Sequence, residues 1–407
     1  MVNARECEDD GMSFSVCRLA PKDQSAAWKL GAIAFGYIDR DMPASWSPNA
    51  PGRRSWGVFD EEDVLVAKAV DREQRQWFGG RLVPTCGVAG VAVAPEHRAS
   101  GLGRAVLTQL LAGARDRGAV ISTLFATTPW PYRRLGWEEV GALVYQALPA
   151  SALAGVSSPM NMRLRAAHEG DVPRLRGIYQ ATARTSTGMM ERSGPLFDKN
   201  PTEFLAPFDG VTVAVNSAGE VEGYSAWKRG TGYDANSTVT IDDLVALTSD
   251  ATRALLANAG SWASVAPTLL IRLPHPDPAL TMMSSIRSTV RSRQPWMLRV
   301  VDAAGAVAAR GWPTLIDGEV GLSLEDDVCA WNGGDYRLVL SGGQGRLEPS
   351  SVHGARMTAR GFALWYAGAA GPEVLRRAGL LTGGDLSDDE FLGTATAGPT
   401  PSLLDYF

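Results

Sequence analysis

The stretch at residues 87–104, with the sequence GVAGVAVAPEHRASGLGR, constrains the fold of this chain more than any other. Valines alternate with small residues up to Pro95, as in a buried strand. Gly101 and Gly103 then precede a helical pattern, in which apolar residues recur every four positions at Leu102, Val106, Leu110 and Ala114. Glycines have no Cβ, so backbone N–H groups ahead of this helix can converge on one anion, which the helix dipole also favours. The stretch therefore predicts a strand, a loop and a helix whose first turn binds a pyrophosphate.

The spacing within the loop separates three kinds of phosphate site. A Walker loop needs Gly-Lys-Ser/Thr, but Gly103 is followed by Arg104 and Ala105. A dinucleotide fingerprint starting at Gly101 would need a third glycine where Val106 stands. What remains is an R-x-x-G-x-G/A pattern at residues 98–103. The alternative is a glycine-rich turn that only caps a surface helix.

Length and composition bound the class of protein. A chain of 407 residues is long enough for two or three domains with cores of their own. The hydrophobic share of 45% and the charged share of 20% are typical of globular proteins. No apolar run approaches the ~20 residues of a membrane span, and the acidic N-terminus lacks the apolar stretch of a signal peptide. We therefore expect a cytoplasmic protein with no membrane partner.

Charge and metal-binding residue types exclude further classes. The net charge of −5 gives no general attraction to nucleic acid and mildly favours cationic substrates. The cysteines form no C-x-x-C pair and the histidines are scattered, so we expect neither a metal site nor a disulfide framework. These residues are Cys7, Cys17, Cys86, Cys329, His97, His168, His275 and His353.

A second motif follows the next expected strand, residues 120–126. Tyr132, Gly136 and Trp137 form a Tyr-x-x-x-Gly-aromatic pattern. Together with the loop at residues 98–103, this pattern resembles the GNAT superfamily of acyl-CoA N-acyltransferases. The alternative for Tyr132 is a core tyrosine with a hydrogen-bonded hydroxyl.

The rest of the chain suggests two more units. Residues 162–171 lead into a helix as residues 16–23 do, which indicates an internal repeat without a second R-x-x-G-x-G loop. After about residue 291 an α+β pattern follows, with strands expected at residues 296–301 and after Trp331-Asn332-Gly333-Gly334. That part is similar to a sterol-carrier-like domain.

The order of these units resembles the Eis (enhanced intracellular survival) family of acetyltransferases. The resemblance implies a mixed α/β and α+β fold of two tandem GNAT-like domains, the second degenerate, followed by a sterol-carrier-protein-like domain. We expect the catalytic domain at residues 1–150, the degenerate domain at 151–290 and the C-terminal domain at 291–407. The family resemblance also implies a homohexamer.

The cofactor expected from the resemblance is acetyl-CoA. The residues expected to bind it are Val91, Ala92, Val93, Arg98, Ala99, Ser100, Gly101, Leu102, Gly103 and Arg104. A backbone amide of Val91 or Val93 can hold the thioester oxygen as it becomes an oxyanion. Tyr132 is the candidate general acid for the departing thiolate, and the resemblance implies the same role.

The general base is less apparent from the residues. Near the motifs stand only Glu96 and His97 in the loop turn and Glu138 and Glu139 after the tyrosine. The resemblance implies that the base is the terminal carboxylate of Phe407. Burial among aromatic residues would raise its pKa and help it to accept a proton. Asp405, or a water held by backbone groups, is the alternative.

Four aromatic residues are candidates for the walls of the acceptor pocket, although each is alternatively a core residue: Trp28, Phe35, Trp46 and Trp130. Residues 36–56 have no clean period and form either a lid or a plain loop. We expect direct acetyl transfer to primary amines of a polycationic small molecule such as an aminoglycoside. Lysine side chains or a natural-product amine are alternatives. Other classes are a lipid-binding carrier with a vestigial acyltransferase domain and an inactive scaffold.

Overall fold

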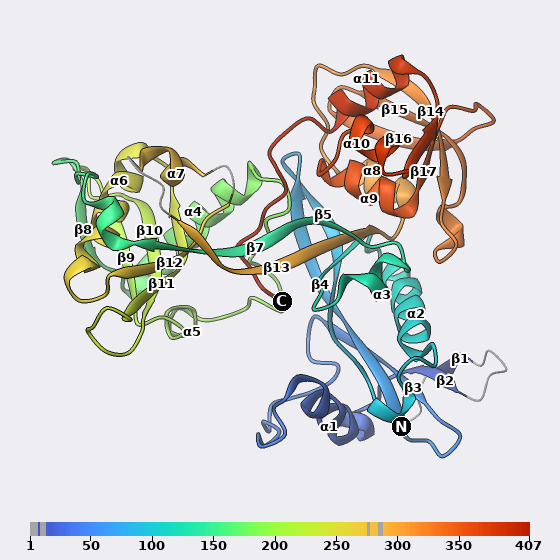
Figure 1. Ribbon diagram of the computed structural model, residues 1–407, viewed down its shortest axis with the longest axis horizontal. Coiled ribbons are helices and arrows are strands. Elements are labelled where there is room, and N and C mark those ends of the chain that lie inside the picture. Colours follow the sequence, from blue (N-terminus) through green and yellow to red (C-terminus); the bar gives the residue numbers. More distant parts are fainter. Residues whose placement is uncertain (1–6, 9–13, 275–276, 284–287) are drawn as a thin grey trace.

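The computed structural model describes residues 7–8, 14–274, 277–283 and 288–407. Two sheets organise these residues (Figure 1). The larger has 13 strands in the order β1-β2-β3-β4-β5-β6-β13-β7-β12-β11-β10-β9-β8, and the smaller has five in the order β16-β15-β14-β17-β18. The mixed α/β arrangement agrees with the expected fold class.

The first part of the chain builds one half of the large sheet. Its strands are β1 (Cys7–Glu8), β2 (Ser15–Arg18), β3 (Arg53–Phe59), β4 (Leu65–Phe78), β5 (Arg81–Val93) and β6 (Ile121–Phe125). Its helices are α1 (Gln24–Phe35), α2 (Leu102–Asp116) and α3 (Pro129–Arg133). Helix α2 buries its apolar stripe, including Val106 and Leu110, against this half-sheet, so the predicted strand, loop and helix are all present.

The second part builds the other half. Its strands are β8 (Arg163–Ala166), β9 (Gly210–Val215), β10 (Val221–Arg229), β11 (Thr238–Ala246) and β12 (Thr268–Arg272). Its helices are α4 (Val172–Arg184), α5 (Pro201–Leu205), α6 (Ser249–Gly260) and α7 (Pro278–Met282). Where the first half has a glycine loop before α2, this half has Thr248, whose hydroxyl caps α6 by accepting from the amide of Ala251.

The internal repeat is visible in local detail. In each half a short strand leads into a 3-10 turn and then a helix, and an aspartate closes the turn. Asp23 accepts a bond from the amide of Ala20 at 2.8 Å, and Asp171 accepts one from the amide of His168 at 2.9 Å. The two halves thus share the local start that the predicted internal repeat requires.

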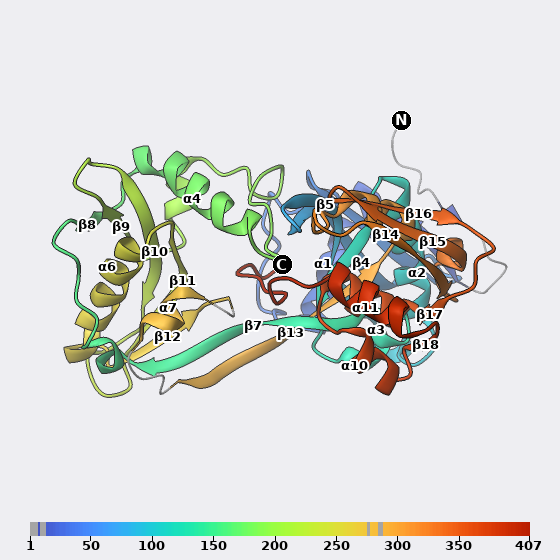
Figure 2. The same ribbon diagram turned by 90° about the horizontal axis from the view of Figure 1, so that it is seen from above.

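Two long strands join the halves, β7 (Glu138–Pro149) and β13 (Thr289–Val300). Strand β13 pairs with both β6 and β7, and β7 also pairs antiparallel with β12, so β7 and β13 form an arm between the lobes (Figure 2). We expected the strand at residues 296–301 in the third unit. It lies instead in the large sheet, where Trp296, Met297 and Leu298 are fully buried. The domain limits stay predictions.

The third part carries the smaller sheet. Its strands are β14 (Gly318–Glu325), β15 (Gly334–Ser341), β16 (Gln344–Pro349), β17 (Ala355–Thr358) and β18 (Leu381–Gly383). Its helices are α8 (Ala303–Ala309), α9 (Ala359–Ala367), α10 (Pro372–Arg377) and α11 (Leu386–Ala395). One apolar core joins this part to the first, because Phe78 and Tyr366 pack with ring centroids 5.5 Å apart.

One expectation about cysteines was wrong. Cys17 is disulfide-bonded, and Cys7 stands opposite it in the pairing of β1 with β2. Four cysteines without a spacing pattern could not indicate this bond, because it depends on strand pairing. No helix among the described residues has both the length and the apolarity needed to cross a membrane.

Candidate active site

The candidate site lies where strands β5 and β6 of the first half separate. Strands β5 and β6 pair in parallel only where residues 85–87 of β5 lie beside residues 121–123 of β6. Beyond that point lies a cavity of about 800 Å³. Its wall includes the glycine loop, Tyr132 and Phe407, which are far apart in the sequence.

A bulge in β5 shapes one wall of this cavity. Lys68 pairs with Ala92 and Val70 with Ala89, so Gly90 and Val91 have no register partner on β4. Gly90 has φ +57°, a conformation that favours glycine. Val91 and Val93 line the cavity, whereas the side chain of Ala92 is buried in a cluster with Leu30 behind it. The bulge therefore places Val91 out of register with β4 at the wall of the cavity.

The loop before α2 presents unused amides. The amides of residues 99–104 make no hydrogen bond within the described part of the chain. Gly101 has φ +86°, and a Cβ placed there would meet nothing within 4 Å, so the space in front of the helix is open. The cavity wall includes Arg98, Ala99, Gly101, Leu102, Gly103 and Arg104. Ser100 does not line it, because its hydroxyl donates to the carbonyl of His97.

Tyr132 faces the cavity from the short helix α3. Burial raises the pKa of its phenol, and the hydroxyl makes no hydrogen bond with the described residues. Its ring packs edge-on against Trp137 at 6.1 Å between centroids. A satisfied core hydroxyl was the alternative, and the described contacts give the hydroxyl no such partner.

The turn after Tyr132 packs against the buried side chain of Arg299. Gly136 has φ +89°, and a Cβ there would lie 1.7 Å from Nη1 of Arg299. Arg299, from β13, is fully buried and binds Asp326 with two bonds of 2.7 and 2.8 Å. The Tyr-x-x-x-Gly pattern thus needs glycine because another part of the chain occupies the space of a side chain.

The C-terminal tail runs from the third part to the junction of the two lobes (Figure 1). The amide of Ser402 donates to the carbonyl of Thr187 at 2.9 Å, and Leu403 and Leu404 are buried. The rings of Tyr406 and Phe407 pack on Phe125 with centroids 4.8 and 5.2 Å away. The chain therefore ends inside the same cavity as Tyr132.

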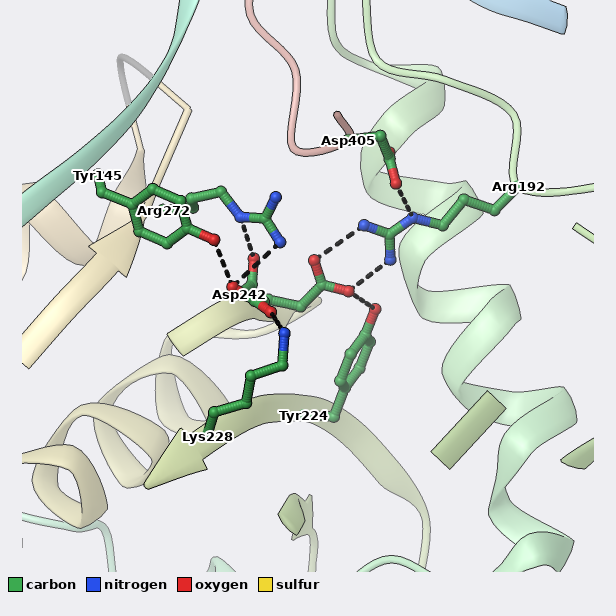
Figure 3. A network of polar contacts seen from close by, with 8 residues as sticks. Tyr145, Arg192, Tyr224, Lys228, Asp242, Arg272 and Asp405 are labelled. Carbon is green, nitrogen blue, oxygen red and sulfur yellow. Dashed lines mark hydrogen bonds and ion pairs between the residues drawn. The ribbon is translucent and has the colours of Figure 1, made fainter. Parts of the chain in front are cut away.

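Asp405 anchors this tail to the second half of the molecule (Figure 3). One of its oxygens accepts from Nε of Arg192 at 2.9 Å, and the other accepts from the hydroxyl of Tyr179 at 2.8 Å. Both carboxylate oxygens are occupied, so Asp405 is poorly placed to be the alternative base. It is instead a positioning residue for the two residues that follow it.

Arg192 is held in turn by Asp243. Its Nη2 donates to Asp243 at 2.9 Å, and the hydroxyl of Tyr224 donates to the same carboxylate at 3.0 Å. Burial would raise the pKa of Asp243, but the charge and hydrogen bonds of Arg192 keep it below its usual range. Sequence reasoning missed Arg192 and Asp243, because no local pattern links residues in different elements.

The anchor leads to a first prediction. Asp405→Asn removes the ion pair but leaves Arg192 bound to Asp243, so the fold is kept and the tail loosens. Carboxypeptidase A should release Phe407 about tenfold faster or more, since hydrogen bonds to charged groups are worth about 1.5–3 kcal/mol. Asp389→Asn, which breaks the Arg376 pair in the third part, is the matched control. Equal release from both variants would show that Asp405 does not hold the tail.

The four candidate pocket walls have different positions. Phe35 borders both the main cavity and a neighbouring one of about 320 Å³, and Trp46 borders the neighbour. Trp28 borders neither and packs against Trp46 at 5.5 Å between centroids. Trp130 is 65% exposed on α3 and also borders neither. Residues 36–52 form no helix or strand, and part of that segment covers the smaller cavity.

Comparison with known proteins agrees with this architecture. Residues 16–140 and 188–300 each match an acetyltransferase (GNAT) domain family, and residues 303–402 match a sterol carrier protein domain family. An uncharacterized N-acetyltransferase of Streptomyces avermitilis is 27% identical over 328 residues, covering 77% of this chain and 78% of the relative. The N-acetyltransferase Eis of Mycobacterium tuberculosis is 25% identical over 362 residues, covering 84% and 86%.

Solved structures share the whole fold. The crystal structure of a GCN5-related N-acetyltransferase from Kribbella flavida has a TM-score of 0.81 at 28% identity and covers 97% of this chain and 98% of that one. Eis1 from Mycobacterium abscessus has the same fold, with a TM-score of 0.77 at 20% identity over 97% and 100%.

The matches to two GNAT domains define this protein as an acyltransferase of the GNAT superfamily. The sterol carrier domain that follows them, and the similarity to the N-acetyltransferase Eis over most of the chain, agree with the expected resemblance to the Eis family.

Proposed function

We propose that this protein transfers an acetyl group directly from acetyl-CoA to a primary amine of a small molecule. The observation that carries the proposal is one cavity lined by the unused amides of the loop, the phenol of Tyr132 and the end of the chain at Phe407. GNAT acetyltransferases generally use acetyl-CoA, and the open space before α2 suits its pyrophosphate.

The residues divide the chemistry among them. Acetyl-CoA supplies an activated acetyl thioester. The amides of residues 99–104 hold its pyrophosphate, and the Val91 amide stabilises the oxyanion that forms when the amine attacks the carbonyl carbon. The terminal carboxylate of Phe407 takes a proton from the amine nitrogen. Tyr132 gives a proton to the sulfur as the carbon–sulfur bond breaks.

The finer parts of the function belong to this proposal. An aminoglycoside-like polycation, a lysine side chain and a natural-product amine are all primary amines that the mechanism accepts. The homohexamer implied by the resemblance also stays a prediction. The alternative class is a lipid carrier with a vestigial acyltransferase domain. Such a carrier would not require free amides in the loop or a Tyr132 hydroxyl that faces the cavity without a partner among the described residues.

A substitution in the loop tests the proposal. Gly101→Glu places bulk and negative charge where the pyrophosphate should bind, so acetyl-CoA affinity should fall about a hundredfold or more, and thiol release with a panel of amines should disappear. Gly118→Glu is a matched control at the other end of α2, since Gly118 has φ +88° and equally open surroundings. If calorimetry shows that Gly101→Glu still binds acetyl-CoA with native affinity, the loop is not the cofactor site.

A further inference from the structure

The smaller cavity is a second chamber of the active site. It shares Phe35, Ala89, Gly90, Tyr406 and Phe407 with the main cavity. Among the described residues, none from the loop at 98–104 borders it. If the main cavity holds acetyl-CoA, this chamber is therefore where the acceptor approaches the thioester.

Three cationic side chains line this chamber, namely Arg53, Lys68 and Arg72. Lys68 and Arg72 lie on one face of β4 with Val70 between them, and Arg53 stands opposite Arg72 in the pairing of β3 with β4. The chamber's lining contains no aspartate or glutamate side chain. The carboxylate of Phe407 is the one negative group that the lining residues supply.

These cations lack partners. No side-chain hydrogen bond or ion pair connects Arg53, Lys68 or Arg72 to another described residue, although Lys68 is only 5% exposed. Nε of Arg72 is buried and unpaired. Burial lowers the pKa of Lys68 to about 8, and burial together with the charge of Arg53 lowers the pKa of Arg72 to about 10. A buried charge without a partner is costly, so the fold gains nothing from this cluster.

Neighbouring cations are paired, which makes the contrast specific. Arg54 binds Glu73 at 3.1 Å, and Arg117 binds Asp71 with bonds of 2.6 and 2.7 Å. Both acids are on β4 but neither borders the chamber. The sheet thus pairs its cations elsewhere and leaves three unpaired at the chamber, where a ligand can reach them.

We propose that the acceptor is an amine that also carries a carboxylate, and that Arg53, Lys68 and Arg72 bind this carboxylate while the amine faces the thioester. This inference rests on the proposed function and narrows its substrate class. A single terminal carboxylate cannot neutralise three cations, so a polycationic acceptor would be repelled from the chamber. An amino acid satisfies both requirements, because arginines bind carboxylates with directed hydrogen bonds.

The first test compares matched acceptors. Thiol release from acetyl-CoA should show a kcat/KM for 6-aminohexanoate at least about tenfold above that for 1,5-diaminopentane or kanamycin, because a charged hydrogen-bonding partner contributes that much or more. A preference for either polycation would overturn the inference and leave the proposed function intact.

Variants identify the residues. Arg72→Gln and Arg53→Gln should each lower kcat/KM for 6-aminohexanoate by about 10- to 100-fold and leave that for 1,5-diaminopentane unchanged or higher. Because each change removes an unpaired cation, the Tm should not fall, as it would for a structural residue. Arg54→Gln is the control, since its side chain pairs with Glu73 outside the chamber. An equal effect of all three variants would overturn the assignment.

A binding measurement separates the two proposals. Calorimetry of the CoA-saturated enzyme should detect 6-acetamidohexanoate, and Arg72→Gln should weaken it about tenfold or more, whereas uncharged 6-acetamidohexanamide should bind weakly to both. If this pattern holds while no amine releases thiol, the anion site stands and the proposed reaction fails. If both probes bind equally, the anion site is refuted whatever the activity.

Discussion

Extending the chain by one alanine beyond Phe407 is expected to lower kcat by about 10²- to 10⁴-fold, the range contributed by a general base. The extension turns the carboxylate of Phe407 into a neutral amide, which cannot take a proton from an ammonium. The new carboxylate would lie about 3.5 Å further along the chain. Acetyl-CoA affinity should change little, because the loop at residues 98–104 is untouched.

The same extension placed at the N-terminus is the control. Stopped-flow thiol release separates chemistry from product release, and the Tm shows whether the tail still packs on Phe125. Deleting Phe407 should be as damaging, since the chain would then end one residue earlier at the exposed Tyr406. A C-terminally extended enzyme with full kcat would remove the carboxylate from the mechanism and leave water as the base.

Local chemistry made much of the first half predictable. The amphipathic stripe of α2 and the two glycines before it act over a few residues, so the strand, loop and helix follow from the sequence. Tyr132 and Gly136 belong to one short turn for the same reason. The order of the three units was predicted through the resemblance, in which the first and third units carry patterns of their own and the middle unit repeats only the start of the first.

The features that the sequence did not predict depend on contacts between residues far apart in the chain. Asp405 meets Arg192 from 213 positions away, and β13 enters the large sheet between β6 and β7. The periodicity of each segment indicates a strand or a tail, but not its neighbours. The disulfide of Cys17 was missed for the same reason.

Net charge does not describe the local charge of the chamber. The value of −5 favoured cationic substrates, yet the chamber beside Phe407 gathers three cations and no acidic side chain. Charge counted over a whole chain describes its distant field, whereas a ligand in a chamber responds to groups within a few ångströms. The Arg53-Arg54 pair shows the difference, because strand alternation sends one arginine to the chamber and the other to Glu73.

Removing the hydroxyl of Tyr132 is expected to cause the second large loss of kcat. Tyr132→Phe should lower kcat by about 10²- to 10⁴-fold, because the departing thiolate loses its proton donor. The Kd for acetyl-CoA should be nearly unchanged. The Tm should be unchanged too, since the hydroxyl has no hydrogen-bond partner among the described residues and the ring still packs on Trp137.

The pH profile distinguishes an acid from a simple wall residue. Burial raises the pKa of Tyr132 above its ordinary value of 10.0, so the phenol keeps its proton over the whole neutral range. In the native enzyme, loss of kcat from this group should therefore begin only above about pH 10. The phenylalanine variant should lack that alkaline loss, because nothing at this position can ionise. A variant that keeps full kcat would refute the acid role, and an alkaline loss that persists unchanged would assign it to another group.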